Sequence, residues 1–154
     1  RERDSIVRFL NYPVRVTYAG RLDKDSRGLL LMTNNGDIIN QMMRAANRHE
    51  KEYKVTVDKE ITEQFIKKMS EGVPILDTVR RPCTVKKIGK YTFSIILTQG
   101  LNRQIRRMCR DLGLTVLRLR RVSQGPLNLG GLRAGEIQAL NEREVAALRR
   151  AVGL

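Results

Sequence analysis

Apolar residues alternate with polar ones, or form short uninterrupted runs, along six stretches of the chain. Residues 51–57 alternate most regularly, with Tyr53, Val55 and Val57 on one face and charged or polar residues on the other. Because successive side chains of a strand point to opposite faces, this pattern predicts a half-buried strand. The expected strands are residues 14–18, 29–32, 51–57, 82–88, 91–98 and 114–122, of which the fourth and fifth form an antiparallel hairpin with its turn at 89–90.

Between these strands, apolar residues recur at intervals of three and four, which predicts amphipathic helices. Thr62 is a suitable N-cap for one helix, and Gly72 suits its end. Asn141 and Glu144 have the spacing of a capping box before the last helix. The expected helices are residues 4–11, 37–46, 63–71 and 101–112 and a final helix that buries Val145, Leu148 and Val152, whereas the glycine-rich residues 123–135 are expected to form a loop.

Short strands that alternate with helices favour the α+β class, with a mixed and largely antiparallel sheet flanked by helices. At 154 residues the chain has the length of one domain with a substantial core. It has no Trp, so mainly aliphatic side chains must fill that core. We find no internal repeat, P-loop or GxGxxG motif.

The helix expected at 101–112 separates apolar from basic residues. At about 100° per residue, its arginines gather on the side opposite its apolar residues. Arginine suits two-point contacts with phosphate or carboxylate groups, although a solvated basic face is the alternative. The apolar side consists of Leu101, Ile105, Met108, Cys109 and Leu112, and the basic side of Arg103, Arg106, Arg107 and Arg110.

The charge of the chain indicates a polyanionic partner. Thirty Lys and Arg residues oppose sixteen Asp and Glu residues, which gives a formal net charge of +14. We expect nucleic acid rather than a membrane, because no apolar run approaches the ~20 residues of a spanning helix. Cys83, Cys109 and His49 lack the spacing of a metal site, and two cysteines are no disulfide framework, so we expect no metal and a cytoplasmic location.

The segment from Gly20 to Leu31 concentrates the candidate chemistry. It holds Asp23 and Asp25 among basic residues and glycines, between two strand-like runs. Loops held by a sheet at both ends are common positions for reactive groups, although aspartates also serve simply as turn residues. A serine-hydrolase triad is not expected, because His49 is the single histidine and no nucleophile elbow is present.

This segment is one of three that together form a recognisable set. They are GRLDKDSRGLLLMTNNGD (residues 20–37), KEYKVTVDK (51–59) and QGLNRQIRRMCRDLG (99–113). In these segments, which run through most of the chain, the sequence resembles the bacterial pseudouridine synthases of the RsuA type. The sequence NRQIRRM, where other branches have a His before the Gln, is most similar to the RluF branch, which acts on large-subunit ribosomal RNA. The resemblance implies a bent mixed sheet with the active cleft across one face.

The resemblance also implies roles for individual residues. Asp23 would be the essential carboxylate, either as a nucleophile or as the base that starts a glycal route. Arg106 would form an ion pair with Asp23, and Tyr53 would stack on the flipped uracil. Arg21 would help to hold the nucleotide out of its helix or would fill the vacated space. Further RNA contacts are expected from Lys24, Arg103, Arg107 and Arg110, together with Lys86, Lys87 and Arg118 to Arg121.

Three further expectations concern the whole protein. The family usually has an RNA-binding S4 domain and a first strand upstream, so residues 1–154 would be the catalytic domain without them. The expected partner is ribosomal RNA, with tRNA as a second candidate, and we expect a monomer that needs no metal or organic cofactor. A non-catalytic RNA-binding or RNA-chaperone domain is the alternative, because it would explain the charge without any chemistry.

Overall fold

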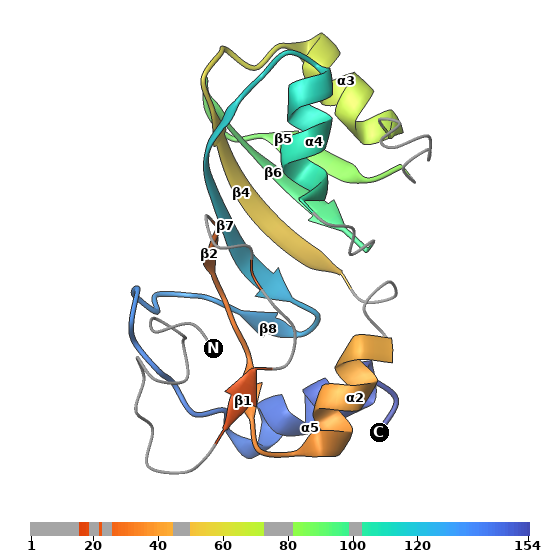
Figure 1. The fold of residues 1–154 in the computed structure, drawn as a ribbon, viewed down its shortest axis with the longest axis vertical. Helices are drawn as coiled ribbons and strands as arrows, with labels where there is room; N and C mark the ends of the chain where they lie inside the picture. Colours follow the sequence, from red (N-terminus) through yellow and green to blue (C-terminus); the bar gives the residue numbers. More distant parts are fainter. Residues whose placement is uncertain (1–15, 19–21, 23–25, 45–49, 73–81, 99–102) are drawn as a thin grey trace.

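The computed structural model describes residues 16–18, 22, 26–44, 50–72, 82–98 and 103–154 (Figure 1). The helix expected at 4–11 lies outside them. The described elements are β1 (Thr17–Tyr18), β2 (Arg27–Gly28), β3 (Met32–Thr33), α2 (Gly36–Arg44), β4 (Lys51–Val57), α3 (Glu63–Glu71), β5 (Thr84–Lys87), β6 (Thr92–Leu97), α4 (Gln104–Asp111), β7 (Val116–Gln124), β8 (Leu127–Asn128) and α5 (Glu142–Ala151).

One mixed sheet organises the fold, as the α+β prediction requires. Its strands follow the order β2-β7-β4-β6-β5, and β8 pairs with β7 at one end. The pairs β4–β6, β4–β7, β5–β6 and β7–β8 are antiparallel, whereas β2 runs parallel to β7. The predicted hairpin is therefore confirmed, and a separate two-stranded pair joins β1 to β3.

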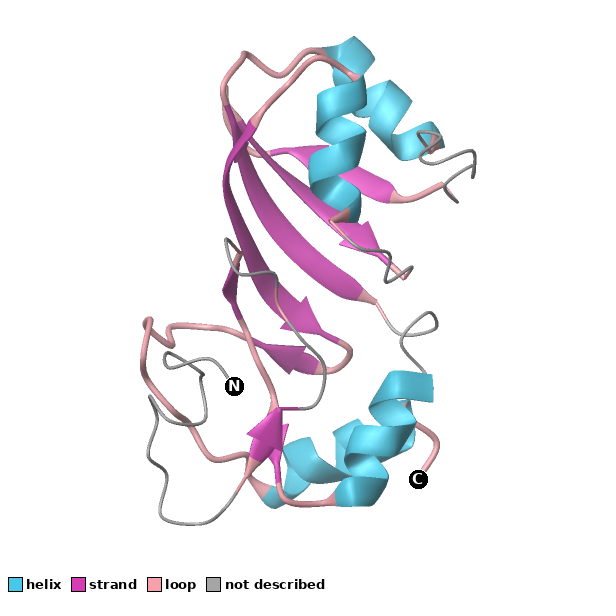
Figure 2. Ribbon diagram, in the orientation of Figure 1, coloured by secondary structure: helices cyan, strands magenta, loops and turns pink. Residues whose placement is uncertain are grey.

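Helices α3 and α4 lie on the same face of this sheet, which we call the covered face (Figure 2). They bury a cluster with residues such as Val55, Ile95 and Met108. Phe65 of α3 and Phe93 of β6 meet edge to face, with ring centroids 5.3 Å apart, a favoured aromatic geometry. Thr62 caps α3 as predicted, because its hydroxyl accepts a hydrogen bond from the Phe65 amide at 3.1 Å.

Helices α2 and α5 lie near the end of the sheet that carries β8 and form a second cluster (Figure 1). Leu31, Ile38, Met42, Leu127, Leu148 and Val152 are its buried members. The predicted capping box is confirmed: Asn141 Oδ1 accepts from the Glu144 amide at 2.8 Å, and Glu144 Oε1 accepts from the Asn141 amide at 2.9 Å. No helix in the described ranges is long and apolar enough to cross a membrane.

Four local expectations were wrong. The strand expected at 29–32 does not form as one run: β2 ends at Gly28, which has φ +115°, and Met32 begins β3. Helix α4 begins at Gln104 rather than 101, since Arg103 is left-handed. Residues 123–135 are not all loop, because β7 continues to Gln124 and β8 pairs with it. Val145 is 36% exposed, because the second cluster meets α5 through other residues.

Candidate functional site

Two buried cations lie where β4 pairs with β7 on the covered face. Lys51 is 8% exposed and Arg121 is 3% exposed. Tyr53 lies opposite Arg121, and Lys51 lies opposite Gln124, which is also buried. Directly opposed residues of a ladder share a face of the sheet. On the covered face, the residues beneath α3 and α4 are apolar, whereas Lys51, Arg121 and Gln124 form a buried polar cluster where β4 pairs with β7.

Arg121 binds the backbone that follows the Asp23 segment. Its Nε and Nη2 atoms donate to the Leu29 carbonyl oxygen at 3.0 and 2.8 Å, and the Leu29 amide donates to the Arg121 carbonyl at 2.8 Å. Gly28 approaches the same backbone so closely that a Cβ atom would lie 2.1 Å from the Arg121 carbonyl oxygen. Glycine is therefore required at this position. These contacts fix residues 28–29 on β7, just beyond Asp23 in the sequence.

Lys51 lies in an electrostatically unfavourable place for an ammonium group. Burial lowers its pKa from the ordinary value of 10.5, and the nearby positive charge of Arg121 lowers it further. Both effects disfavour the charged form of the side chain. Lys51 and Arg121 thus place two positive charges close together at a buried point of the covered face.

Arg103 sets the start of α4. Its φ of 51° and ψ of 35° are left-handed, a conformation that is uncommon for residues other than glycine. Its side chain forms no capping hydrogen bond, while its carbonyl accepts from the Arg107 amide at 3.1 Å. The first turn of α4 carries no acidic residue. The positive end of the helix dipole at this point is a suitable position for an anion.

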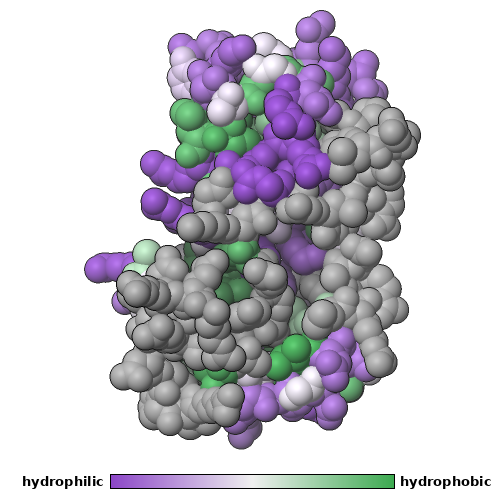
Figure 3. Space-filling view, viewed as in Figure 1, coloured by the Kyte–Doolittle hydropathy of each residue, from purple (hydrophilic) through white to green (hydrophobic). Residues whose placement is uncertain are grey.

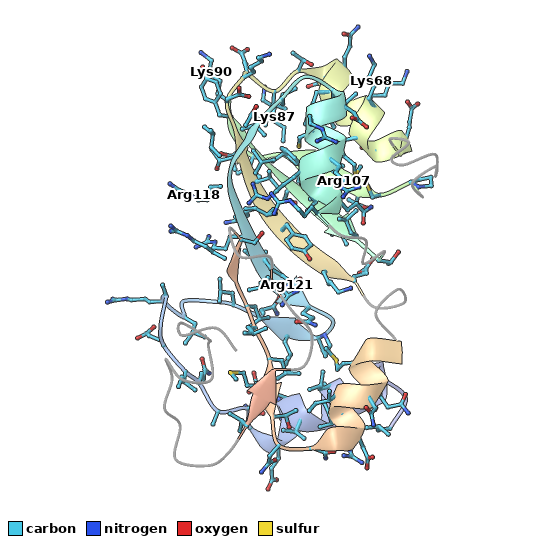
Figure 4. The ribbon with its side chains drawn as sticks, viewed as in Figure 1. Lys68, Lys87, Lys90, Arg107, Arg118 and Arg121 are labelled. Atoms are coloured by element: carbon cyan, nitrogen blue, oxygen red, sulfur yellow. The ribbon has the colours of Figure 1, made fainter. Side chains whose placement is uncertain are left out.

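The predicted basic side of α4 is confirmed as a surface. Figure 3 shows hydrophilic residues gathered over α4, and Figure 4 shows Arg107 on that helix. Arg103 and Arg110 are exposed, whereas Arg106 and Arg107 are half-buried. Burial raises the pKa of the Cys109 thiol to about 12, and the positive charge of Arg106 partly opposes that rise. The guanidinium of Arg106 is thus close to the helix–sheet interface.

The structure describes two of the predicted catalytic residues, one on the covered face and one on a helix above it. Tyr53 packs against the cluster that contains Ile105 of α4, and Arg106 is half-buried on the same helix. Tyr53 is half-buried, as expected for an aromatic residue at the edge of a core. The predicted residues Arg21, Asp23 and Lys24 lie outside the described residues.

Sequence reasoning missed three residues of this site. Arg121 was expected to contact phosphates, but it is buried and binds Leu29 instead. Lys51 and Gly28 were not singled out. A signal for Lys51 was present, because it occupies the same alternating face as Tyr53 and Val55. The close approach of Gly28 depends on pairing with a strand about ninety residues away, which no local pattern reports.

Comparisons with known proteins indicate one family. A model of a family described as RNA pseudouridylate synthase matches residues 2–111. The chain is 54% identical over 147 residues to the dual-specificity RNA pseudouridine synthase RluF of Escherichia coli K12, covering 96% of this chain and 51% of that protein. It is 35% identical to ribosomal large subunit pseudouridine synthase B of Bacillus subtilis, covering 92% of this chain and 60% of that protein.

A solved structure shares the fold. A crystal structure of a pseudouridylate synthase superposes with a TM-score of 0.84 at 28% identity, covering 94% of this chain and 65% of that one. The chain spans about half the length of the RluF proteins that it matches. The match to the family covers well over half of this chain, and the relatives and the fold agree with it. The chain belongs to the RNA pseudouridylate synthase family.

Proposed function

We propose that this chain is the catalytic domain of an RNA pseudouridine synthase that isomerises a uridine of ribosomal RNA, with 23S RNA as the favoured substrate. Family membership and the 54% identity to RluF support the reaction class. The observation that carries the proposal is the position of Tyr53 on the covered face, opposite Arg121, whose side chain binds the Leu29 backbone beyond the Asp23 segment. Arg106 is half-buried on α4, the helix that covers this part of the sheet.

The reaction needs few protein groups. The bond from N1 of uracil to C1′ breaks, the base turns, and a bond from C5 to C1′ forms. The hydrogen of C5 leaves as a proton and N1 gains one, so no redox partner or cofactor is required. Asp23 supplies the essential carboxylate, either as the nucleophile or as the base of a glycal route.

The described residues support this role for a carboxylate. Arg106 is half-buried, and Lys51 and Arg121 add two buried cations on the same face of the sheet. A neighbouring cation favours the ionised form of an aspartate. In the proposed site Arg106 pairs with Asp23, and Tyr53 stacks on the uracil. Arg21 holds the nucleotide out of its helix, which is needed because a base paired within a helix cannot be turned over.

The remaining cations of the proposed site bind the RNA backbone. Arg103 and Arg110 are exposed and Arg107 is half-buried on the outer side of α4, and Lys24 belongs to the Asp23 segment. Such contacts position RNA without reading its sequence and make binding strongly dependent on salt. The chain would act as a monomer in the cytoplasm, and part of its target selection would come from an upstream S4 domain.

Tritium release from ribosomal RNA that carries [5-³H]uridine tests this proposal. The wild-type chain should release tritium, and Asp23→Asn should bind the same RNA without releasing it. Restoring the upstream segment, and repeating the assay if the chain alone is inactive, separates a truncated enzyme from a binding module. Absence of release both without and with the upstream segment, with RNA binding intact, would reject the enzyme in favour of an RNA-binding or chaperone domain.

A further inference from the structure

The face of the sheet opposite α3 and α4, which we call the open face, carries a row of cations. The pairing registers place Lys86 beside Ser94, Ser94 beside Lys54, Lys54 beside Arg120, and Arg120 beside Arg27. All four cations are exposed. With about 4.8 Å between neighbouring strands, this row of five strands spans about 19 Å.

A second row continues the basic surface next to it. Arg118 lies opposite Thr56, which lies opposite Thr92. The two threonine hydroxyl oxygens are 3.4 Å apart. Figure 4 shows Arg118 on the opposite side of β7 from α4, which carries Arg107. Hydroxyl donors thus lie among the cations, and both kinds of group suit phosphate oxygens.

The cations of this row are not neutralised within the described part of the chain. None of Lys86, Lys54, Arg120 and Arg27 makes an ion pair with another described residue. Glu52 is the acid that the described strand registers place on this face, and it lies opposite Ile96 and Ser123 instead of a cation. Like charges directly opposite each other in a ladder destabilise a sheet. An external polyanion would relieve this repulsion.

We propose that the open face binds the phosphates of a second RNA segment, distinct from the one that carries the target uridine. This inference rests on the proposed function. Tyr53 lies on the covered face and Arg106 on α4, which covers it, whereas Lys54 and Arg120 face away from the proposed site. A large folded RNA can supply both segments. The open face would then hold the enzyme on a structured substrate without taking part in the reaction.

Three exposed cations allow a matched test. The row variant carries Lys54→Gln, Lys86→Gln and Arg120→Gln, and the control variant carries Lys67→Gln, Lys68→Gln and Arg149→Gln, which are exposed on α3 and α5. Both lose the same charge. Binding to 23S ribosomal RNA and to a 12-nucleotide oligouridine is measured at several salt concentrations, and thermal melting confirms that each variant is folded.

The row variant should bind 23S RNA more weakly than the control variant, and its plot of log affinity against log salt should be shallower by about 3, since each lost phosphate contact removes about one unit. Binding of the short oligouridine should be equally affected in both variants. Equal losses for 23S RNA would overturn the proposal and leave a solvated face or a surface for another protein segment. These results measure RNA binding, so they test the open face separately from the proposed reaction, which is tested by tritium release from the wild-type chain.

Discussion

The two faces of the sheet use the same residue types in opposite ways. On β4, Lys51 is buried and Lys54, three residues later, is exposed; on β7, Arg121 is buried and the preceding Arg120 is exposed. The buried members lie beside the proposed site, and Arg121 binds the backbone of Leu29. The exposed members lie opposite each other on the open face. Strand alternation places the buried and the exposed cations of each strand on opposite faces of the sheet.

This difference shows what a net charge of +14 conceals. A net charge adds all cations together, as if each contributed equally to a general attraction for RNA. In this fold, some cations are buried and therefore desolvated. Burial strengthens their electrostatic interactions with the groups that they contact, and it raises the free-energy cost of moving them away from those groups. Substitutions of neighbouring residues on one strand should therefore have very different effects.

Gly28→Ala should have the largest effect. The added Cβ would lie 2.1 Å from the Arg121 carbonyl oxygen at a φ of +115°, so β2 must move away from β7. We expect a loss of about 2 kcal/mol or more in the free energy of unfolding, together with loss of tritium release. Urea unfolding measures the stability. The adjacent Arg27→Ala, on an exposed residue, should change it by less than about 0.5 kcal/mol, and a similar loss in both variants would contradict the close approach.

Arg121→Met should have the next largest effect. It leaves the Leu29 carbonyl without its side-chain donors, which costs about 1–3 kcal/mol when such a group is buried. Displacement of the Asp23 segment by about 1 Å would slow single-turnover tritium release about 10²-fold. Arg121→Lys keeps the charge but not the two-point contact, so it should resemble the Met variant. Arg120→Met serves as the control and should leave the rate at saturating enzyme unchanged, because Arg120 is exposed on the open face.

Lys51→Met should change how stability depends on pH. The pKa of Lys51 is lowered by burial and by Arg121, so below pH 10.5 the unfolded chain binds a proton that the folded chain binds less readily. The contribution of Lys51 to stability therefore decreases as the pH falls from 10.5 through its lowered pKa. Urea unfolding between pH 7 and 10 should show this slope in the wild type and less of it in Lys51→Met. Lys54→Met should keep the wild-type slope; a loss of slope in both variants would contradict the assignment.

The thiols should show the smallest effect. Burial raises the pKa of Cys109 to about 12 and that of Cys83 to about 11, and the thiolate is the reactive form. At pH 8 both should react slowly with a disulfide reagent in the folded chain and rapidly in urea. Rapid reaction of Cys109 in the folded chain would contradict its burial between α4 and the covered face.

Local patterns predicted much of this fold. The alternation at 51–57, the Thr62 cap and the capping box at Asn141 are all observed, because each depends on neighbours within a few residues. The burial of Arg121 could not be predicted in this way. Arg118, Arg120 and Arg121 look alike in the sequence. Which of them is buried depends on a bulge between β4 and β7 and on the contact with the distant Leu29.

The roles of the site residues depended on the family resemblance more than on physical patterns. Periodicity separated Arg106 from the apolar side of α4, and alternation placed Tyr53 on the buried face. Neither pattern distinguishes a catalytic residue from one at the edge of a core. The left-handed conformation of Arg103 could not be predicted either, because no local sequence pattern indicates a positive φ at an arginine.

The most direct test of the difference between the faces is single-turnover tritium release from labelled 23S RNA at saturating enzyme, measured together with Kd for Arg106→Gln and the row variant. Arg106→Gln should lower the rate about 10²–10³-fold, as expected for the loss of one electrostatic group, with little change in Kd. The row variant should raise Kd and leave the saturated rate unchanged. A slower saturated rate in the row variant, or a wild-type rate in Arg106→Gln, would contradict the assignment of chemistry to the covered face and binding to the open face.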